Sequence, residues 1–248
     1  MPDERRQYAE LAELAGSLIH EIKNHLSTLG LNLQLLAEDF QEPKNQRERR
    51  ALERAQRLQD ECQRLVEVSN DFLRFARIKE LDFQPTALSD MFEELLDFFE
   101  PTARQANIDI KCHLPADLPR VSLDRDLFKQ ALLNLLLNAQ QAMPGGGHVT
   151  IQANTIADCG LRIADSSDQS AIRNPQSAIE LCLIDTGKGM SPEVVAKAFK
   201  PFFSTRSGGT GLGLPTTRKI IEAHGGTIEL ESAEGRGTKF TIQLPVAV

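Results

Sequence analysis

Apolar residues recur at steps of three and four over two long stretches on either side of Pro43. This spacing places them along one face of a helix. The stretch before Pro43 carries Leu11, Ala15, Leu18, Ile22, Leu26, Leu29, Leu33 and Leu36, and the stretch after it carries Ala55, Leu58, Cys62, Leu65, Ser69, Phe72 and Ala76. A proline in the polar segment QEPKNQ breaks a helix, so an antiparallel helical hairpin is predicted here. Because one hairpin cannot bury both sides of its stripe, we expect a homodimer with a four-helix bundle.

The first of these helices contains IHEIKNHL, with histidines at positions 20 and 25. A zinc-protease motif needs two histidines four residues apart on one helix face. Here the spacing is five, so the rings diverge by roughly 140°, and a zinc site is disfavoured. His20 shares a face with Asn24 and points away from the apolar stripe. Taken alone, it is an exposed surface histidine.

Composition excludes several classes of protein. The chain has 248 residues, a net charge of −7 and an acidic pI of about 5.3, so no nucleic-acid partner is expected. No apolar run reaches the roughly 20 residues of a membrane span, and the N-terminus has no signal-peptide core. The four cysteines are scattered without a CxxC pair, which favours reduced thiols and a cytoplasmic location.

The sequence pattern changes after Lys79, and the segment LDFQPTA is interpreted as a linker. Helices are predicted over 88–105, 124–143, 191–199 and 212–226, with Asp124 and Ser191 as N-caps and Pro192 at a first helical position. Strands are predicted over 108–114, 148–154 and 179–185 and as a final pair over 227–246. Mixed helices and strands in this order predict a two-layer α/β domain. Residues 155–180 contain QSAI twice and are interpreted as a flexible inserted loop.

Three polar or glycine-rich signals follow one another in the second domain. Asn134 and Asn138 lie one turn apart on a helix. The segment DTGKGM follows a buried strand, so Asp185 could accept a hydrogen bond while Gly187 and Gly189 allow close backbone approach. The third signal, GGTGLGL at 208–214, opens a helix, where backbone amides can hold phosphate. Each alone is weak, and the absence of GxxxxGK[ST] excludes a P-loop.

Together, these motifs resemble a bacterial two-component sensor histidine kinase, close to the nitrogen-regulation kinase subgroup. HEIKNHL resembles the H box, NLLLNAQQA the N box, DTGKGM the G1 box, FKPFFSTR the F box, GGTGLGLP the G2 box and GRGTKF the last glycine motif. The resemblance implies an α+β fold: a helical hairpin over 1–80 that dimerises and carries the phosphoacceptor, and an ATP-binding domain of the GHKL (Bergerat) type over 86–248.

The resemblance also implies roles. His20 would accept phosphate from ATP and pass it to an aspartate of a response-regulator receiver domain, and Glu21 would orient it or take its proton. Asn24 would serve a phosphatase activity on the regulator. Asn138, with Asn134, would hold Mg²⁺ on the ATP phosphates. The remaining nucleotide-binding positions would be Asp185, Gly187, Gly189, Phe202, Phe203, Thr205, Arg206, Gly209, Gly211, Leu212 and Gly213, of which Phe202 to Arg206 belong to a mobile lid. No sensor domain is evident, so a separate sensor protein is a further expected partner.

Two departures from the family pattern stand out. His25 occupies a position where the subgroup usually has proline, which kinks the helix, and we expect His25 to pack near the seam or pair with Glu21. The other departure is the insertion at 155–180.

Three other interpretations remain open on the sequence. The first is an ATPase like gyrase, but these carry glutamate where Asn134 stands, and an amide is no general base. The second is a dimeric scaffold or a regulator phosphatase without kinase activity. The third is a serine kinase of the anti-sigma type, which would lack the H-box hairpin.

Overall fold

The structure, a computed structural model, describes residues 19, 22–76, 81–156, 178–206 and 209–246. The described residues fall into two compact units, which lie within Met1–Arg77 with Arg206–Leu212 and within Ile78–Thr205 with Gly213–Val248. Each unit is described by itself.

The first unit contains the two predicted helices. One runs over residues 22–38, and after a turn and an irregular stretch around Pro43, helix α2 runs over Gln46–Ala76. Asn45 caps the start of α2, since its Oδ1 atom accepts from the backbone N–H groups of Arg47 and Glu48, both at 3.0 Å, and the Glu48 side chain accepts from the Lys44 N–H at 2.6 Å. The two bonds to Asn45 satisfy N–H groups that the first turn of a helix leaves free. The break predicted at Pro43 is confirmed, because α2 starts after it.

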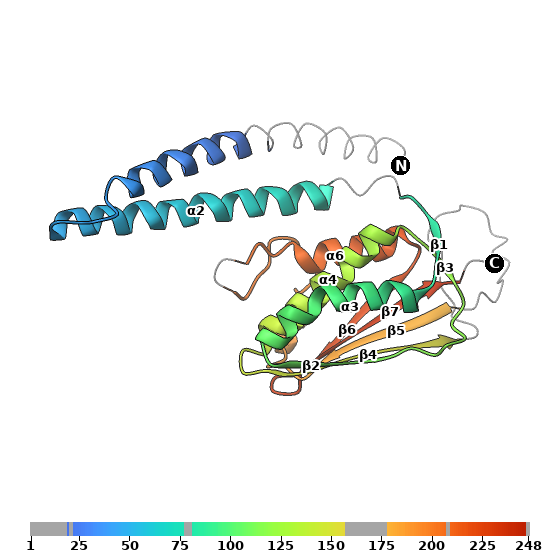
Figure 1. The fold of residues 1–248 in the computed structure, drawn as a ribbon. Helices are drawn as coiled ribbons and strands as arrows, with labels where there is room; N and C mark the ends of the chain where they lie inside the picture. Colours follow the sequence, from blue (N-terminus) through green and yellow to red (C-terminus); the bar gives the residue numbers. More distant parts are fainter. Residues whose placement is uncertain (1–18, 20–21, 77–80, 157–177, 207–208, 247–248) are drawn as a thin grey trace. The chain divides into compact units, whose positions relative to one another are not determined.

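The second unit is a five-stranded sheet with helices on one face (Figure 1). The strands are β2 (Ile108–His113), β4 (Gly147–Ile156), β5 (Ala178–Asp185), β6 (Thr227–Ser232) and β7 (Thr238–Pro245), in the order β2-β4-β5-β7-β6. The β2–β4 pair is parallel and the other pairs are antiparallel. The helices are α3 (Leu88–Gln105), α4 (Arg125–Ala142), the short α5 (Pro192–Val195) and α6 (Gly213–Ala223).

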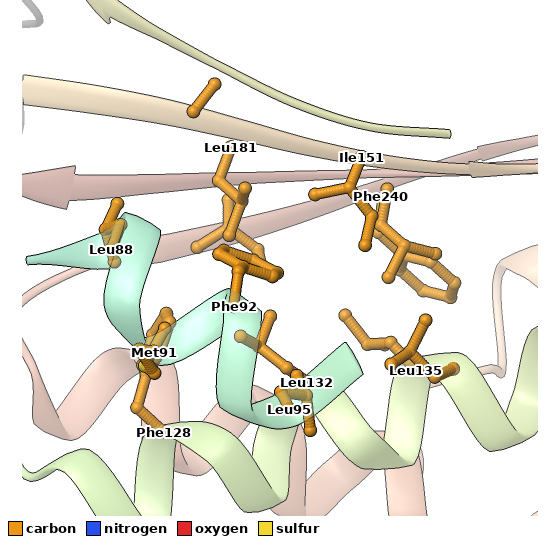
Figure 2. Packing of buried hydrophobic residues seen from close by; sticks show 14 of the residues in the cluster. Leu88, Met91, Phe92, Leu95, Phe128, Leu132, Leu135, Ile151, Leu181 and Phe240 are labelled. Carbon is orange, nitrogen blue, oxygen red and sulfur yellow. The ribbon is translucent and has the colours of Figure 1, made fainter. Parts of the chain in front are cut away.

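A single hydrophobic core lies between the sheet and α3, α4 and α6. Figure 2 shows side chains of α3 and α4, among them Phe92 and Leu135, facing Ile151, Leu181 and Phe240 of the strands. The side chains of successive strand residues point to opposite faces of the sheet, so every second residue of a strand faces this core. On β5, for example, Ile179, Leu181 and Leu183 face the core. The predicted α+β fold with a two-layer α/β domain is confirmed.

Several local predictions need correction. LDFQPTA is more than a linker, since Gln84–Thr86 forms strand β1, antiparallel to β3 (Val121–Leu123). Residues 155–156 and 178–180 belong to β4 and β5 instead of the predicted loop, and 157–177 lie outside the described residues. The predicted cap at Ser191 makes no side-chain cap bond. The cap at Asp124 is confirmed, because its side chain accepts from the Leu127 N–H at 3.1 Å.

Candidate functional site: a buried carboxyl in a glycine cradle

Asp185 ends the central strand β5 and is almost completely buried, with 3% of its surface exposed. Its Oδ1 atom accepts a hydrogen bond from the Gly187 N–H at 2.8 Å, and the Thr238 backbone and side chain also hydrogen-bond to the carboxyl group. Burial raises the pKa of Asp185, while the bonds from Gly187 and Thr238 oppose that rise. The site therefore holds a strong hydrogen-bond acceptor away from water.

Glycines line the backbone around this carboxyl. A Cβ atom on Gly187 would lie 2.7 Å from the Ala142 Cβ and 2.8 Å from the Asp185 Oδ1 atom. Gly189 and Gly237 have positive φ angles, of 65° and 82°. A Cβ atom on either would come within 1.9 Å of a backbone oxygen, that of Ala233 or of Asp185. No other residue type fits at these positions without moving the backbone.

Two flanking elements hold the loop that follows Asp185. The Lys188 N–H donates to the Ala142 carbonyl at the end of α4, at 3.1 Å, and the Lys188 carbonyl accepts from the Gly235 N–H at 2.8 Å. The Met190 N–H donates to the Ser232 Oγ atom at 3.0 Å, and that hydroxyl donates to the Gly237 carbonyl at 2.8 Å. The loop is thus fixed between α4 and the β6–β7 turn.

Asn134 and Asn138 lie half-buried on α4, beside the buried residues Leu135 and Ala139. Asn138 stands one helical turn before Ala142, whose carbonyl binds the loop after Asp185. The structure therefore brings the helix of the predicted N box to the predicted G1 box. Among the residues described, no group of three or more His, Cys, Asp or Glu side chains could hold a metal ion.

The segment after α5 belongs to the same unit as far as Thr205. Phe199 packs against the core, and the Arg218 guanidinium lies over its ring at 5.4 Å from the centroid. Phe203 is half-buried, with the Lys197 Nζ atom 6.0 Å from its ring centroid. Phe202 has a positive φ of 63° and is 61% exposed. Thr205 is also exposed.

Arg206–Leu212 is grouped with the helical unit. Burial lowers the pKa of the half-buried Arg206 guanidinium. Gly209 is exposed and Gly211 has a positive φ of 67°. Leu212 is fully buried, and its N–H donates to the Thr210 hydroxyl at 3.3 Å. Gly213, the first residue of α6, belongs to the α/β unit.

The predicted phosphoacceptor region is described only in part. His20 and Glu21 lie outside the described residues. Asn24 is an exposed residue of the helix over 22–38. His25 is exposed on the same helix in the single chain. Its expected packing near the seam or pairing with Glu21 stays a prediction, because Glu21 lies outside the described residues.

Sequence reasoning did not assign a site role to Gly237 and Thr238. Both contact the Asp185 residue directly, one through backbone geometry and the other through hydrogen bonds. The signal was GRGT at 235–238, since two glycines with a positive φ angle before a strand indicate a tight turn. Its proximity to Asp185 depends on the β5–β7 pairing, in which Asp185 is opposite Thr238.

The fold and this site define a GHKL-type α/β domain joined to a helical hairpin. The chain belongs to the family of histidine kinase-, DNA gyrase B- and HSP90-like ATPases, whose sequence model matches residues 123–248. The model of the His Kinase A (phospho-acceptor) domain matches residues 10–81. The resemblance to sensor histidine kinases is thereby confirmed.

Named relatives agree with this assignment. The chain is 33% identical over 242 residues to the sensor histidine kinase ZraS of Klebsiella oxytoca, covering 98% of this chain and 47% of ZraS. It is 33% identical to the signal transduction histidine-protein kinase AtoS of Escherichia coli (strain K12), covering 96% of this chain and 35% of AtoS. The chain thus spans less than half the length of these relatives.

Solved structures show the same fold. Full-length ShkA in complex with AMPPNP has a TM-score of 0.68 and 25% identity, with 95% of this chain and 46% of ShkA covered. The histidine kinase ThkA in complex with the response regulator protein TrrA has a TM-score of 0.64 and 25% identity, with 98% of this chain and 64% of ThkA covered.

Proposed function

We propose that the chain is the catalytic core of a sensor histidine kinase. It uses ATP to phosphorylate His20, passes the phosphoryl group to an aspartate of a response-regulator receiver domain, and also dephosphorylates that regulator. The observation that carries this proposal is the buried Asp185 carboxyl in its glycine cradle, in a chain whose hairpin matches the phospho-acceptor domain.

Asp185 and the cradle fit the base of a nucleotide. A buried carboxylate accepts hydrogen bonds strongly, so it can bind the exocyclic amino group of adenine and select it over a carbonyl group. Gly187 and Gly189 let the loop backbone approach the base without side-chain interference. The similar structure of full-length ShkA is a complex with AMPPNP, and this supports the same ligand class here.

The phosphates would extend toward α4 and the start of α6. The amide oxygens of Asn138 and Asn134 are suitable hard ligands for Mg²⁺, so these residues would hold the ion, which would neutralise negative charge on the phosphates. Gly213 would bring the N-terminus of α6 to the phosphate chain, where the positive end of the helix dipole favours an anion. We assign Phe202, Phe203, Thr205 and Arg206 to the lid over the nucleotide, and Gly209, Gly211 and Leu212 to the segment that approaches the phosphates.

ATP supplies the phosphoryl group, and ADP leaves with the electrons of the broken P–O bond. His20 contributes a ring nitrogen lone pair, because a large fraction of an ordinary histidine is neutral near pH 7. Glu21, the next residue, would hold the ring or take the proton that the other ring nitrogen releases. Phosphoryl transfer depends mainly on in-line positioning and charge neutralisation. The α/β unit must therefore bring ATP to the His20 ring.

Exposed apolar side chains support the homodimer. Ile22, Leu29 and Leu36 are 42–49% exposed in the single chain, and each follows the previous one by a heptad. Leu58 and Leu65, also a heptad apart, are 55% and 45% exposed on α2. Heptad-spaced residues left exposed by one hairpin form the seam for a second copy.

The proposed domain organisation is a dimerisation and phosphotransfer hairpin over 1–80 and an ATP-binding domain over 86–248, with an insertion near 155–180. The two family matches, at 10–81 and 123–248, support it. No helix in the described ranges is long and apolar enough to cross a membrane. The cytoplasmic location and the separate sensor partner stay predictions.

Asn24 is proposed to serve the phosphatase activity. It is exposed on the first helix, one turn beyond His20, where its amide can orient water against a phospho-aspartate. Asn24→Ala should keep autophosphorylation and lose stimulated dephosphorylation of the regulator. Equal dephosphorylation rates for both proteins would refute this role.

Labelling with γ-labelled ATP tests the main proposal. We expect the wild-type protein to form an acid-labile, base-stable phosphoprotein, His20→Gln to remain unlabelled and His25→Ala to label normally. Phosphate found on His25 by mass spectrometry would contradict the assignment. Asp185→Ala should abolish ATP binding by calorimetry, and unchanged binding would exclude the proposed adenine site. An unlabelled wild-type protein that still dephosphorylates a regulator would favour the phosphatase alternative.

A further inference from the structure

His224 follows the last residue of α6 and is buried, with 5% of its surface exposed. Its ring packs edge-to-face against two phenylalanines, Phe83 at 5.5 Å and Phe128 at 5.6 Å between centroids. Phe83 directly precedes β1, whereas Phe128 is on the first turn of α4. One side chain thus contacts the start of the α/β unit and two of its helices.

Both ring nitrogens of His224 are engaged, and their partners determine the tautomer. The Nδ1 atom lies 2.7 Å from the Ile220 carbonyl oxygen, which can only accept, so Nδ1 carries the hydrogen. The Nε2 atom accepts from the Asp124 backbone N–H at 3.0 Å. The ring therefore donates within α6 and accepts from the N-cap of α4.

Asp124 links His224 to the segment around Asp82 that leads into the α/β unit. Its Oδ1 atom accepts from the Leu127 N–H and caps α4, while its Oδ2 atom accepts from the Asp82 N–H at 3.1 Å. Residues 84–86 then pair with 121–123. We call Asp82, Phe83, Asp124 and His224 the linker anchor, because they hold the first described residues after the segment that leaves α2.

The anchor lies at the opposite end of the α4–α6 pair from the proposed phosphate site. Seven residues from the His224–Asp124 contact along each helix, the Thr217 hydroxyl donates to the Ala131 carbonyl at 3.5 Å. The helices are therefore antiparallel and in register, and Gly213 comes opposite Leu135, between Asn134 and Asn138. The intervening 11 residues of α6 span about 16 Å, so no anchor residue contacts a nucleotide bound there.

We propose that His224 is a positioning residue for phosphoryl transfer, and that it acts by anchoring the interdomain linker to the two nucleotide-binding helices. This inference rests on the proposed kinase function. The chain between the units is short, because α2 ends at Ala76 and the anchor begins at Asp82. If the anchor opens and the three-residue pairing of β1 with β3 is lost with it, residues 82–86 join residues 77–81 and double the length of chain between the units. The effective concentration of the α/β unit near His20 then falls by about threefold, because it varies as the −3/2 power of tether length.

Two substitutions of His224 separate its two hydrogen bonds. In His224→Gln, the amide oxygen can replace Nε2 as the acceptor for the Asp124 N–H. In His224→Asn, the shorter amide can replace the Nδ1 donor to Ile220 but cannot reach Asp124. We expect His224→Asn to lower the kcat of autophosphorylation by about threefold or more with an ATP KM within about twofold of wild type, and His224→Gln to retain kcat. A merely structural role would raise KM with the fall in kcat, or affect both variants equally, and either result would overturn the proposal.

A second pair tests the linker side without changing His224. Asp82→Pro removes the backbone N–H that donates to Asp124, whereas Asp82→Ala keeps it. Only Asp82→Pro should lower kcat. Equal kcat values for Asp82→Pro and wild type would contradict the anchor.

Amide hydrogen exchange gives a readout independent of kinase activity. His224→Asn should increase exchange in a peptide covering residues 81–87, and His224→Gln should not. If the wild-type protein fails to label with ATP, the proposed function fails, whereas this exchange difference still decides whether the anchor exists. Identical exchange in the two variants would exclude it.

Discussion

The two units of the chain bury their apolar side chains to different degrees. In the α/β unit, Phe128, Leu135 and Ile151 have no exposed surface. In the helical unit, Leu33, Ala55 and Cys62 are buried, yet Leu58 and four other apolar side chains of the heptad stripe stay more than 40% exposed. The difference follows from architecture, because a sheet covered by helices encloses a core within one chain, whereas a two-helix hairpin has only one side to bury against.

The two units therefore depend on different partners for stability. The α/β unit contains its core and should remain folded in a monomer. The hairpin exposes a seam that a second hairpin of the same pattern can cover. Mutations in the two units should give separable effects on folding and on assembly.

The largest effect is expected from charges in the exposed seam. Leu58→Asp combined with Leu65→Asp would place four carboxylates in the interface of a dimer, at a cost of several kcal/mol per buried ion. We expect the dissociation constant of the dimer, measured by analytical ultracentrifugation, to rise at least about a thousandfold, which corresponds to about 4 kcal/mol. ATP binding should be unchanged. The matched control is Arg64→Asp on the exposed face of α2, which should remain dimeric. A dimer that survives the double substitution would place its interface elsewhere.

The second-largest effect is expected from a substitution that creates a cavity in the core of the α/β unit. Leu135→Ala removes a fully buried side chain that faces the sheet in Figure 2 and should cost about 2–5 kcal/mol of unfolding free energy. Urea denaturation should show this loss with the dimer affinity preserved. Glu229→Ala, at an exposed position of β6, is the control and should change stability by less than about 0.5 kcal/mol. A weakened dimer in Leu135→Ala would show that the units are not independent.

A smaller effect separates two glycines of the turn before β7. Gly235 and Gly237 both have a positive φ angle, but a Cβ atom on Gly235 meets nothing within 4 Å, whereas one on Gly237 lies 1.9 Å from the Asp185 carbonyl oxygen. Gly235→Ala should cost about 1–2 kcal/mol from backbone strain alone, with ATP binding retained. Gly237→Ala should cost more and weaken ATP binding, because Asp185 must move. Equal ATP affinities in calorimetry would contradict the tight contact.

The smallest effect concerns the pH dependence of the α/β unit without nucleotide. Burial raises the pKa of Asp185 above its ordinary value of about 3.9. The folded protein then holds the proton more tightly than the unfolded chain does. The resulting stability is fully present below the ordinary pKa and is lost as pH rises through the raised value. The Tm of Asp185→Asn minus that of the wild type should therefore increase from about pH 4 toward neutrality. A constant difference would mean that Asp185 titrates normally.

The sequence predicted most of the elements. Helix α3 was expected over 88–105 and occupies those residues, because its apolar residues recur with a helical period. The cap at Asp124 was also predictable, since an aspartate precedes an apolar helix there. Strand β1 was not, because three residues containing a proline have little intrinsic strand signal, and their pairing with β3 depends on a chain separation of more than 30 residues.

The residues of the candidate site also fall into two groups, those that the sequence predicted and those that it did not. Asp185, Gly187 and Gly189 could be selected from one short motif, because a buried strand followed by an acid and glycines indicates a backbone turn at a strand end. Gly237, Thr238 and Ala142 join the site only through the pairing of β5 with β7 and the approach of α4. His224 gave no recognisable signal, since its role requires hydrogen bonds to residues four and 100 positions away.

Local periodicity and short motifs depend on neighbouring residues, so the amino-acid sequence was enough to specify the hairpin, the order of helices and strands, and the motifs of a histidine kinase. Three features emerged from the folded chain instead: which apolar residues of the heptad stripe remain exposed, how the turn before β7 closes over Asp185, and how His224 ties α6 to α4 and to the linker. These features depend on contacts between distant segments. Their energies arise from packing and hydrogen bonds that no single stretch of sequence contains.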